Sequence, residues 1–185
     1  MPSSRVVLVR HGQTALNAQD RLRGLADPEL DEVGIGQARA TAEALRSLGL
    51  ERVLSSPLQR AVLTATIIAD ASGISHAVDP AFNDRDYGPW TGHVRAEVIG
   101  EWGSVDAAPG VEPRAAVLDR VLPALDRLAA APSVVAVVTH DAVIRPILEH
   151  IQPGIAATVP TASWAVLEHD GTAWSVVSVD NVASA

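Results

Sequence analysis

Two continuous apolar runs, one near the start of the chain and one in its last third, dominate the pattern of hydrophobic and polar positions. They are Val6–Val9 and Ser133–Thr139. Their β-branched residues, without alternation of polar positions, predict short strands that are buried on both faces. Arg52–Ser55 and His76–Val78 are shorter runs of the same kind. Together they predict the strands of a mainly parallel sheet.

Between these runs, apolar residues recur at helical spacing. One pattern leads from Leu30 to about Leu48 and stops at Gly49. A second helix is expected to begin at Ser55-Ser56-Pro57, with a serine cap and a proline in its first turn. A third follows Pro113, and a fourth begins at Ala142. The predicted buried faces are Ala38, Ala42, Leu45 and Leu48 in the first helix, Leu58, Val62, Ala65 and Ala69 in the second, and Val117, Val121, Leu125 and Leu128 in the third.

The remaining segments predict loops and a hairpin. The stretch 17–28 is polar and is interpreted as a loop, and 93–112 is expected to hold a short helix and a loop. Ser163–Glu168 and Trp174–Val179 flank Asp170-Gly171, a pair typical of a β-hairpin. Strands that alternate with helices predict one α/β domain over residues 1–185, with helices on both faces of the sheet.

Composition narrows the classes of function. A net charge of −8 disfavours a nucleic-acid partner. The chain has no cysteine and no lysine, which excludes thiol and Schiff-base chemistry and leaves arginine, histidine and backbone amides to bind anions. Because apolar runs stay far below the ~20 residues of a membrane span, and because MPSSR does not resemble a signal peptide, we expect a cytoplasmic protein without a membrane partner.

The candidate site lies where the two long apolar runs end. The first ends in Arg10-His11-Gly12 and the second in Thr139-His140-Asp141. Carboxyl ends of parallel strands share one edge of a sheet, the edge at which α/β proteins bind ligands. His11 and His140 are therefore expected to meet there. The other histidines are interpreted as surface or structural residues, namely His76, His93, His150 and His169.

Further polar residues are candidates for the same edge. Arg60 falls in the first turn of a predicted helix, where a cation is unfavourable unless it shares an anion with the helix amides. Taken alone, Arg60 is better explained as an exposed arginine. The segment Phe82–Gly92 has neither helical nor strand periodicity and contains Asp84, which is typical either of a functional loop or of a surface turn. Asn17 and Arg145 complete the candidate group.

These residue types favour phosphoryl transfer. The planar guanidinium of arginine matches phosphoryl oxygens, and a neutral histidine is an available nucleophile near pH 7. A protonated carboxyl group could protonate the leaving alkoxide. The combination predicts a covalent phosphohistidine intermediate.

Several motifs resemble the histidine phosphatase superfamily, in its phosphoglycerate-mutase-like branch. They are Arg10–Thr14 with Asn17; Gly24, Asp27-Pro28, Leu30, Gly34 and Gln37-Ala38; Ser55–Ala61; Asp84–Gly92; and Thr139–Arg145. Each is weak alone, but their shared order along most of the chain is specific. The resemblance implies a three-layer α/β/α sandwich of the phosphoglycerate-mutase-like fold, with its pocket at the carboxyl ends of the strands.

The resemblance also implies a role for each matching residue. His11 would be the nucleophile that becomes phosphorylated, and Asp84 and His140 would complete the catalytic group. The phosphoryl oxygens would be bound by Arg10, Arg60 and His140 with help from Asn17, and Gly24 and Asp141 would belong to the substrate-binding group. No metal and no cofactor is implied.

Two departures from the family pattern concern the proton donor. Asp84 stands where the family usually has a glutamate, and Asp141 stands where this branch usually has a glycine after the second histidine. In the superfamily's acid-phosphatase branch, an aspartate at that place donates the proton. We favour Asp84 as the acid and expect helix amides to hold Asp141 as a capping carboxylate.

The favoured function is a phosphatase that acts on a small-molecule phosphate ester. A phosphoglycerate mutase is the first alternative, but the segment from Gly92 to Pro113 is short, lacks lysine and offers only His93 and Arg95 as cations. A phosphate-ester-binding module with weak turnover is a second alternative. A metal-dependent hydrolase is a third, disfavoured because Arg10 next to His11 opposes metal binding. The sequence carries no signal for an oligomeric state.

Overall fold

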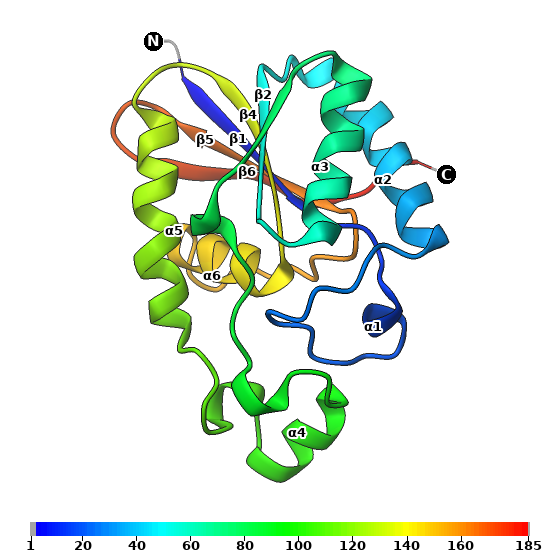
Figure 1. Cartoon of the computed structure of the whole chain (residues 1–185). Helices are drawn as coiled ribbons and strands as arrows, with labels where there is room; N and C mark the ends of the chain where they lie inside the picture. Colours follow the sequence, from blue (N-terminus) through cyan, green and yellow to red (C-terminus); the bar gives the residue numbers. More distant parts are fainter. Residues whose placement is uncertain (1–2, 185) are drawn as a thin grey trace.

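A six-stranded sheet forms the middle layer of the protein, whose computed structural model describes residues 3–184 (Figure 1). The strand order is β3-β2-β4-β1-β5-β6. The strands are β1 (Ser4–Arg10), β2 (Arg52–Ser55), β3 (Ser75–Val78), β4 (Val134–Thr139), β5 (Trp164–His169) and β6 (Trp174–Asn181). Because β3, β2, β4 and β1 are parallel and only the pairings β1–β5 and β5–β6 are antiparallel, the predicted mainly parallel sheet is confirmed.

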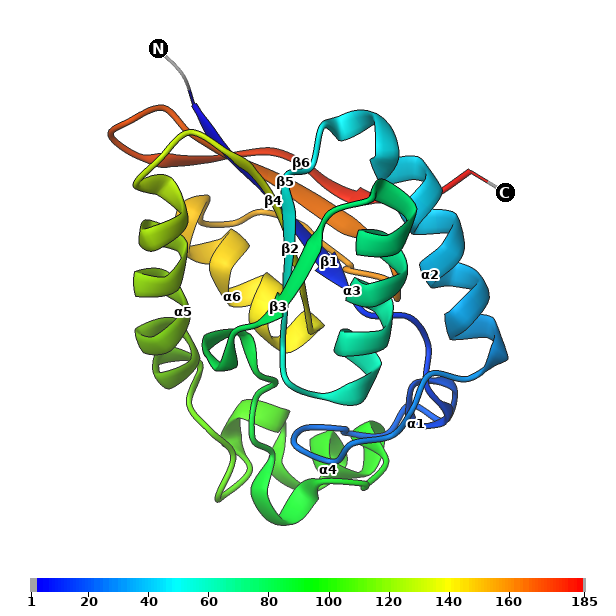
Figure 2. The ribbon, with the colours of Figure 1, turned by 45° about the horizontal axis from the view of Figure 1, so that its top comes forward.

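Helices cover both faces of this sheet, as predicted. Figures 1 and 2 show α2 and α3 on one side and α5 and α6 on the other, with α1 and α4 beyond the end at which β1 and β4 stop. The helices are α1 (Ala15–Ala18), α2 (Glu32–Leu45), α3 (Gln59–Ser72), α4 (Arg95–Trp102), α5 (Arg114–Ala129) and α6 (Asp141–Ile151). No helix within residues 3–184 is long and apolar enough to cross a membrane.

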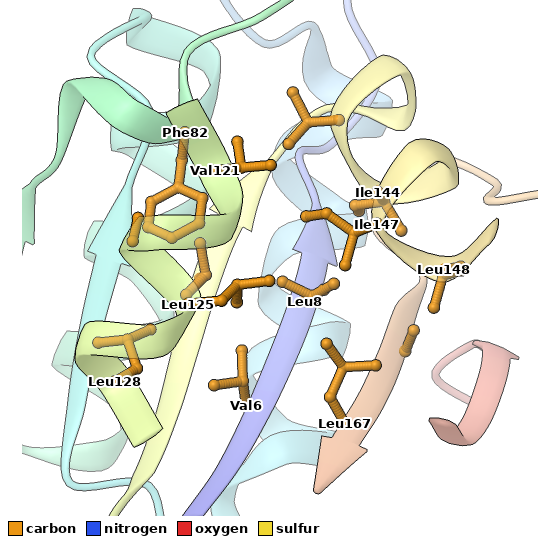
Figure 3. Close-up of a cluster of buried hydrophobic side chains, with 14 of the residues drawn as sticks. Val6, Leu8, Phe82, Val121, Leu125, Leu128, Ile144, Ile147, Leu148 and Leu167 are labelled. Carbon is orange, nitrogen blue, oxygen red and sulfur yellow. The ribbon is translucent and has the colours of Figure 1, made fainter. Parts of the chain in front are cut away.

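Alternation along the central strand explains its continuous apolar run. Val6 and Leu8 pack into a cluster with residues of α5 and α6, which Figure 3 shows in close-up. Val7 and Val9 enter a second cluster with residues of α2 and α3. Since successive side chains of a strand point to opposite faces, a strand covered on both sides needs an apolar residue at every position. The buried face predicted for the helix after Pro113 lies in the first cluster. Of the face predicted for the helix after Leu30, Ala42 and Leu45 lie in the second cluster, Leu48 packs against it, and Ala38 is buried outside it.

The second helix departs from its prediction. α3 begins at Gln59 with Leu58 as its N-cap, so the predicted cap at Ser55-Ser56 is wrong. Both serines bind histidines instead: the Ser55 Oγ lies 2.8 Å from the His76 Nε2, and the Ser56 Oγ lies 2.8 Å from the His140 Nε2. Both hydroxyls are thus hydrogen-bonded to histidines of other elements. The helix begins at Gln59, later than the predicted cap indicates.

Other element boundaries are close to the predictions. α2 ends at Leu45 and continues as a 3₁₀ turn over Arg46–Leu48, with Gly49 in the left-handed conformation at its end. The C-terminal hairpin is confirmed as β5 and β6. Helix α1 was not predicted, since the stretch 17–28 was interpreted as a loop. It is a single turn held by a capping box between Thr14 and Asn17.

Candidate active site

The two histidines meet at the carboxyl ends of β1 and β4. Arg10 pairs with Thr139 at the end of the parallel ladder, and the His11 amide donates to the Thr139 carbonyl over 3.1 Å. The imidazole rings of His11 and His140 lie 5.1 Å apart between centroids, at an angle of 60°. Both side chains are fully buried. Strand pairing therefore creates the histidine pair.

His11 is held in the tautomer that a nucleophile requires. Its Nδ1 lies 2.7 Å from the Gly12 carbonyl oxygen, which can only accept a hydrogen bond, so the proton sits on Nδ1. The Nε2 lone pair then accepts a hydrogen bond from Arg60 Nε at 3.3 Å. Burial, together with neighbouring His140 and Arg60, lowers the pKa of His11 well below its usual value. His11 is thus a neutral imidazole at pH 7, and its unprotonated nitrogen is Nε2, which faces Arg60.

Glycine is required at position 12 for a packing reason. A Cβ on Gly12 would overlap the carbonyl group of Gly34, because the turn after β1 lies directly against the start of α2. The carbonyl of this same residue is the group that faces His11 Nδ1.

Arg60 is buried rather than exposed, so the interpretation of this residue taken alone is wrong. Its Nη1 donates to the carbonyl of Ala26 at 2.7 Å, and its Nη2 donates to the carbonyl of Gly24 at 2.9 Å and to Asp84 Oδ2 at 2.9 Å. These acceptors compensate the buried charge. Gly24, predicted to be a substrate-binding residue, therefore contributes a carbonyl that holds Arg60.

Asp84 lies between Arg60 and the second histidine. Its Oδ2 is 3.4 Å from His140 Nδ1, and its Oδ1 accepts the Arg85 amide at 2.8 Å. Burial raises the pKa of Asp84 above its usual value, although Arg60 acts in the opposite direction. The carboxyl group therefore favours its protonated form more than an exposed aspartate does.

Asp141 has the opposite electrostatic setting. It is the first residue of α6, and its Oδ1 lies 3.0 Å from Arg23 Nη2 and 3.9 Å from Arg10 Nη2. Burial alone would raise its pKa, but Arg10 and Arg23 hold the pKa of this carboxyl well below its usual range. Asp141 stays ionised as expected, but the groups that hold it are arginines and not the predicted helix amides.

A cavity of about 340 Å³ is lined by Arg10 and Asp141 of these groups, together with Asn17 and Arg23. Within residues 3–184, three buried nitrogen donors on its lining residues have no hydrogen-bond partner. They are the Nε of Arg10, the Nε of Arg23 and the Nδ2 of Asn17. Buried donors without acceptors are costly, and three of them around one cavity fit an anion with several oxygens.

Arg23 is the site residue that sequence reasoning missed. It stands in the stretch 17–28, two positions after Arg21 and directly before Gly24. The one sequence feature that could have indicated Arg23 is its position next to Gly24, which matches the family pattern. Its role depends on Asp141, which lies 118 positions away in the sequence, and no local pattern shows that contact.

A second cavity of about 210 Å³ lies under α4 and shares Arg95, Asp141 and Arg145 with the first. Its apolar lining includes Tyr87, Ile99, Val105 and Pro146. Arg145 lines both cavities, but its two Nη atoms donate to the carbonyls of Ala157 and Thr158. The two cavities are therefore neighbours that share three charged side chains.

The residues present do not form an evident metal centre. Within the described part of the chain, no group of three or more histidine, cysteine, aspartate or glutamate side chains could hold a metal ion. The histidine pair instead adjoins three buried arginines, Arg10, Arg23 and Arg60.

Comparison with known proteins agrees with this geometry. The family model of the histidine phosphatase superfamily, branch 1, matches residues 6–182. The chain belongs to the histidine phosphatase superfamily. Among solved histidine-phosphatase-like structures, a mycobacterial glucosyl-3-phosphoglycerate phosphatase in complex with VO3 is 28% identical, with a TM-score of 0.84 over 96% of this chain and 99% of that one. "Mycobacterial hydrolase 1" is 27% identical, with a TM-score of 0.86 over 98% and 100% of the two chains.

Two further relatives carry mutase names. A probable phosphoglycerate mutase GpmB of Yersinia pestis (strain Pestoides F) is 43% identical over 84 residues, which cover 45% of this chain and 39% of the relative. The match thus spans well under half of that curated relative. A phosphoglycerate mutase from Bacillus anthracis str. Sterne has a TM-score of 0.88 at 21% identity, with 97% and 93% of the chains covered, and shows the shared fold. The phosphoglycerate-mutase-like fold predicted from the motifs is confirmed.

Proposed function

We propose that this protein is a phosphatase that hydrolyses a small phosphate monoester through a phosphohistidine on His11, without a metal ion. The observation that carries the proposal is the cavity lined by Arg10, Asn17 and Arg23, whose unpartnered donors suit phosphoryl oxygens. The neutral His11, which follows the lining residue Arg10 in the chain, supplies the nucleophile through Nε2.

The first chemical step forms a bond between His11 Nε2 and phosphorus while the ester P–O bond breaks. The leaving alkoxide takes the proton of Asp84 and departs as an alcohol. Arg10, Arg60 and His140 bind the phosphoryl oxygens as charge shifts onto them, and Asn17 assists.

The second step is the hydrolysis of the phosphohistidine. A water oxygen attacks phosphorus, the P–N bond breaks, and the electron pair returns to His11 Nε2. The Asp84 carboxylate accepts a proton from that water, so phosphate leaves and both side chains regain their starting states. Asp84 can serve both steps because burial favours its neutral form while Arg60, at 2.9 Å, stabilises its ionised form.

Hydrolysis is favoured over mutase activity by the segment above the site. Residues 93–112 form only α4 and a short 3₁₀ turn, Val105–Ala107. Arg85 and Arg114 line the cavity of about 210 Å³ under α4. Both form ion pairs with Asp106, so their charges are already balanced within the protein. A mutase must retain its phosphoryl group and return it to the substrate, which requires firmer enclosure than this short segment supplies. The likeness to a phosphatase over 96% of the chain supports the same choice.

Trapping the intermediate tests the mechanism. Rapid quenching with labelled substrate should yield phosphate on the protein that is acid-labile and base-stable, as expected of phosphohistidine. His11→Ala should abolish both the label and turnover. A label on serine or aspartate, or an unchanged rate in His11→Ala, contradicts the proposal. Turnover that persists after exhaustive chelation disposes of the metal-dependent alternative.

A second assay separates the phosphatase from its alternatives. A panel of phosphorylated metabolites is scored for released phosphate, and 3-phosphoglycerate with catalytic bisphosphoglycerate is assayed for 2-phosphoglycerate. We expect phosphate release from at least one small ester at a rate above any isomerisation. Isomerisation far faster than hydrolysis of every ester supports the mutase, and binding without turnover supports the module.

A further inference from the structure

A single arginine on α5 holds the backbone that carries Asp84. Arg120 Nη1 donates to the carbonyls of Ala81 and Asn83, each at 2.7 Å, and its Nη2 donates to the carbonyl of Asp84 at 3.0 Å. Arg120 is therefore bound to the main chain of the acid-bearing loop at three points. Its side chain keeps 26% exposure.

Glu112 extends this attachment to the far side of Asp84. Arg120 Nε lies 3.5 Å from Glu112 Oε1, and Glu112 Oε2 accepts the Asp86 amide at 2.9 Å. The Glu112 carbonyl also accepts a hydrogen bond from Arg85 Nε at 2.6 Å. The chain is thus fixed both before and after Asp84 by Arg120, within α5, and by Glu112, which precedes that helix.

The loop needs such support because residues 83–87 are neither helix nor strand. A backbone without regular pairing must find partners for its carbonyls elsewhere, and a planar guanidinium fixes several acceptors relative to one another. The Asp84 carboxyl makes contacts of 2.9 Å with Arg60 and 2.8 Å with the Arg85 amide, so a small shift of the loop would break them.

We propose that Arg120 is a positioning residue, which sets the place of the Asp84 carboxyl through the backbone carbonyls of residues 81, 83 and 84. The proposal rests on the proposed function, in which Asp84 is the proton donor. The hydrogen bonds of Arg120 go to the carbonyls of residues 81, 83 and 84 and to Glu112. None goes to His11 or to the residues that line the cavity of about 340 Å³. Its effect on the reaction should therefore resemble a partial loss of the general acid.

The variant Arg120→Leu tests this through leaving groups. On an alkyl phosphate, whose leaving group needs a proton, kcat should fall ~10–100-fold, since displacements of ~1 Å cost about that much. The leaving group of 4-nitrophenyl phosphate needs no proton, so kcat on this ester should stay near the wild-type value. KM should change little for either ester. Arg120→Lys keeps a charge and can restore one of the carbonyl contacts, so it should recover part of the loss.

Two controls separate positioning from general damage. Arg127→Leu alters another arginine of α5, one whose 63%-exposed side chain lies 3.5 Å from Asp79, and should leave both esters unaffected. Combined with Asp84→Asn, Arg120→Leu should add almost nothing on the alkyl ester, because the group it positions is already gone. Equal losses on both esters, or additive losses in the double variant, overturn the proposal.

Hydrogen exchange gives a readout without turnover. The amides of Asp84 and Arg85 donate to Asn83 Oδ1 and Asp84 Oδ1. Their hydrogen exchange should be faster in Arg120→Leu than in the wild type and should be unchanged in Arg127→Leu. Unchanged exchange in Arg120→Leu overturns the proposal even when activity falls. If the wild-type protein releases no phosphate from any ester, the proposed function fails. The exchange experiment needs no turnover, so it still tests whether Arg120 positions the loop.

Discussion

Asp84 and Asp141 are two buried aspartates of the candidate site, and their pKa values are shifted in opposite directions. Burial pushes the pKa of both upward. Asp84 faces Arg60, whose other donors are shared with the carbonyls of Gly24 and Ala26, and its pKa stays raised. Asp141 faces both Arg10 and Arg23, and its pKa is depressed. The arrangement of arginines around each carboxyl group, rather than depth of burial, separates a raised pKa from a depressed one.

The largest expected effect comes from removing the titrating proton at Asp84. Asp84→Asn keeps the side chain's shape and should lower kcat by the ~10²–10⁴-fold typical of a lost general acid, with a smaller loss on 4-nitrophenyl phosphate. Asp141→Asn is the matched control and should show no dependence on the leaving group. If only the Asp141 variant becomes sensitive to the leaving group, the acid is Asp141 and the comparison is reversed.

The next largest effect concerns stability and falls on the other aspartate. Asp141→Asn leaves Arg23 and Arg10 without their buried counter-ion, which should lower the free energy of unfolding by about 3 kcal/mol. Asp84→Asn should cost less, because burial raises the pKa of Asp84 and so makes its ionised form less favourable than that of Asp141. Urea unfolding at pH 7 in phosphate-free buffer measures both. Equal losses would show that the two carboxyl groups carry the same charge.

The smallest effect is a difference in pH dependence. A carboxyl whose pKa is raised on folding stabilises the fold most below its unfolded pKa of ~4, and that contribution is lost as pH rises through the folded value. Asp141, with a depressed pKa, contributes above pH ~4 and loses that contribution as pH falls through its folded pKa. The stability of Asp84→Asn relative to wild type should therefore increase with pH above ~4, by at most ~1.4 kcal/mol per unit.

The corresponding difference for Asp141→Asn should shrink below pH 4, where wild type loses the contribution of the ionised carboxyl. Unfolding titrations of the two variants and of wild type over pH 3–7, at constant ionic strength, give both trends. Parallel curves for the two variants would remove the distinction between these aspartates.

The sequence by itself determined the strands, the long helices, the family and the edge of the sheet at which the site lies. Apolar runs and helical spacing are local consequences of burial, so the strands at Val6 and Val134 and the face of α5 were predictable. The histidines were predictable because a strand's end fixes where the next residue stands, and parallel strands end at one edge.

Only the tertiary structure decided which charges are buried and what each polar group contacts. Arg60 reads as an exposed arginine in its helix, yet it is buried because carbonyls from residues 24 and 26 and the carboxyl of Asp84 surround it. Arg23 belongs to the site because it binds Asp141. Ser56, predicted to cap a helix, is hydrogen-bonded to His140 instead. Hydrogen bonds and Coulomb forces act between groups that folding brings together from distant positions, so their partners, and with them the pKa directions of Asp84 and Asp141, are properties of the folded chain alone.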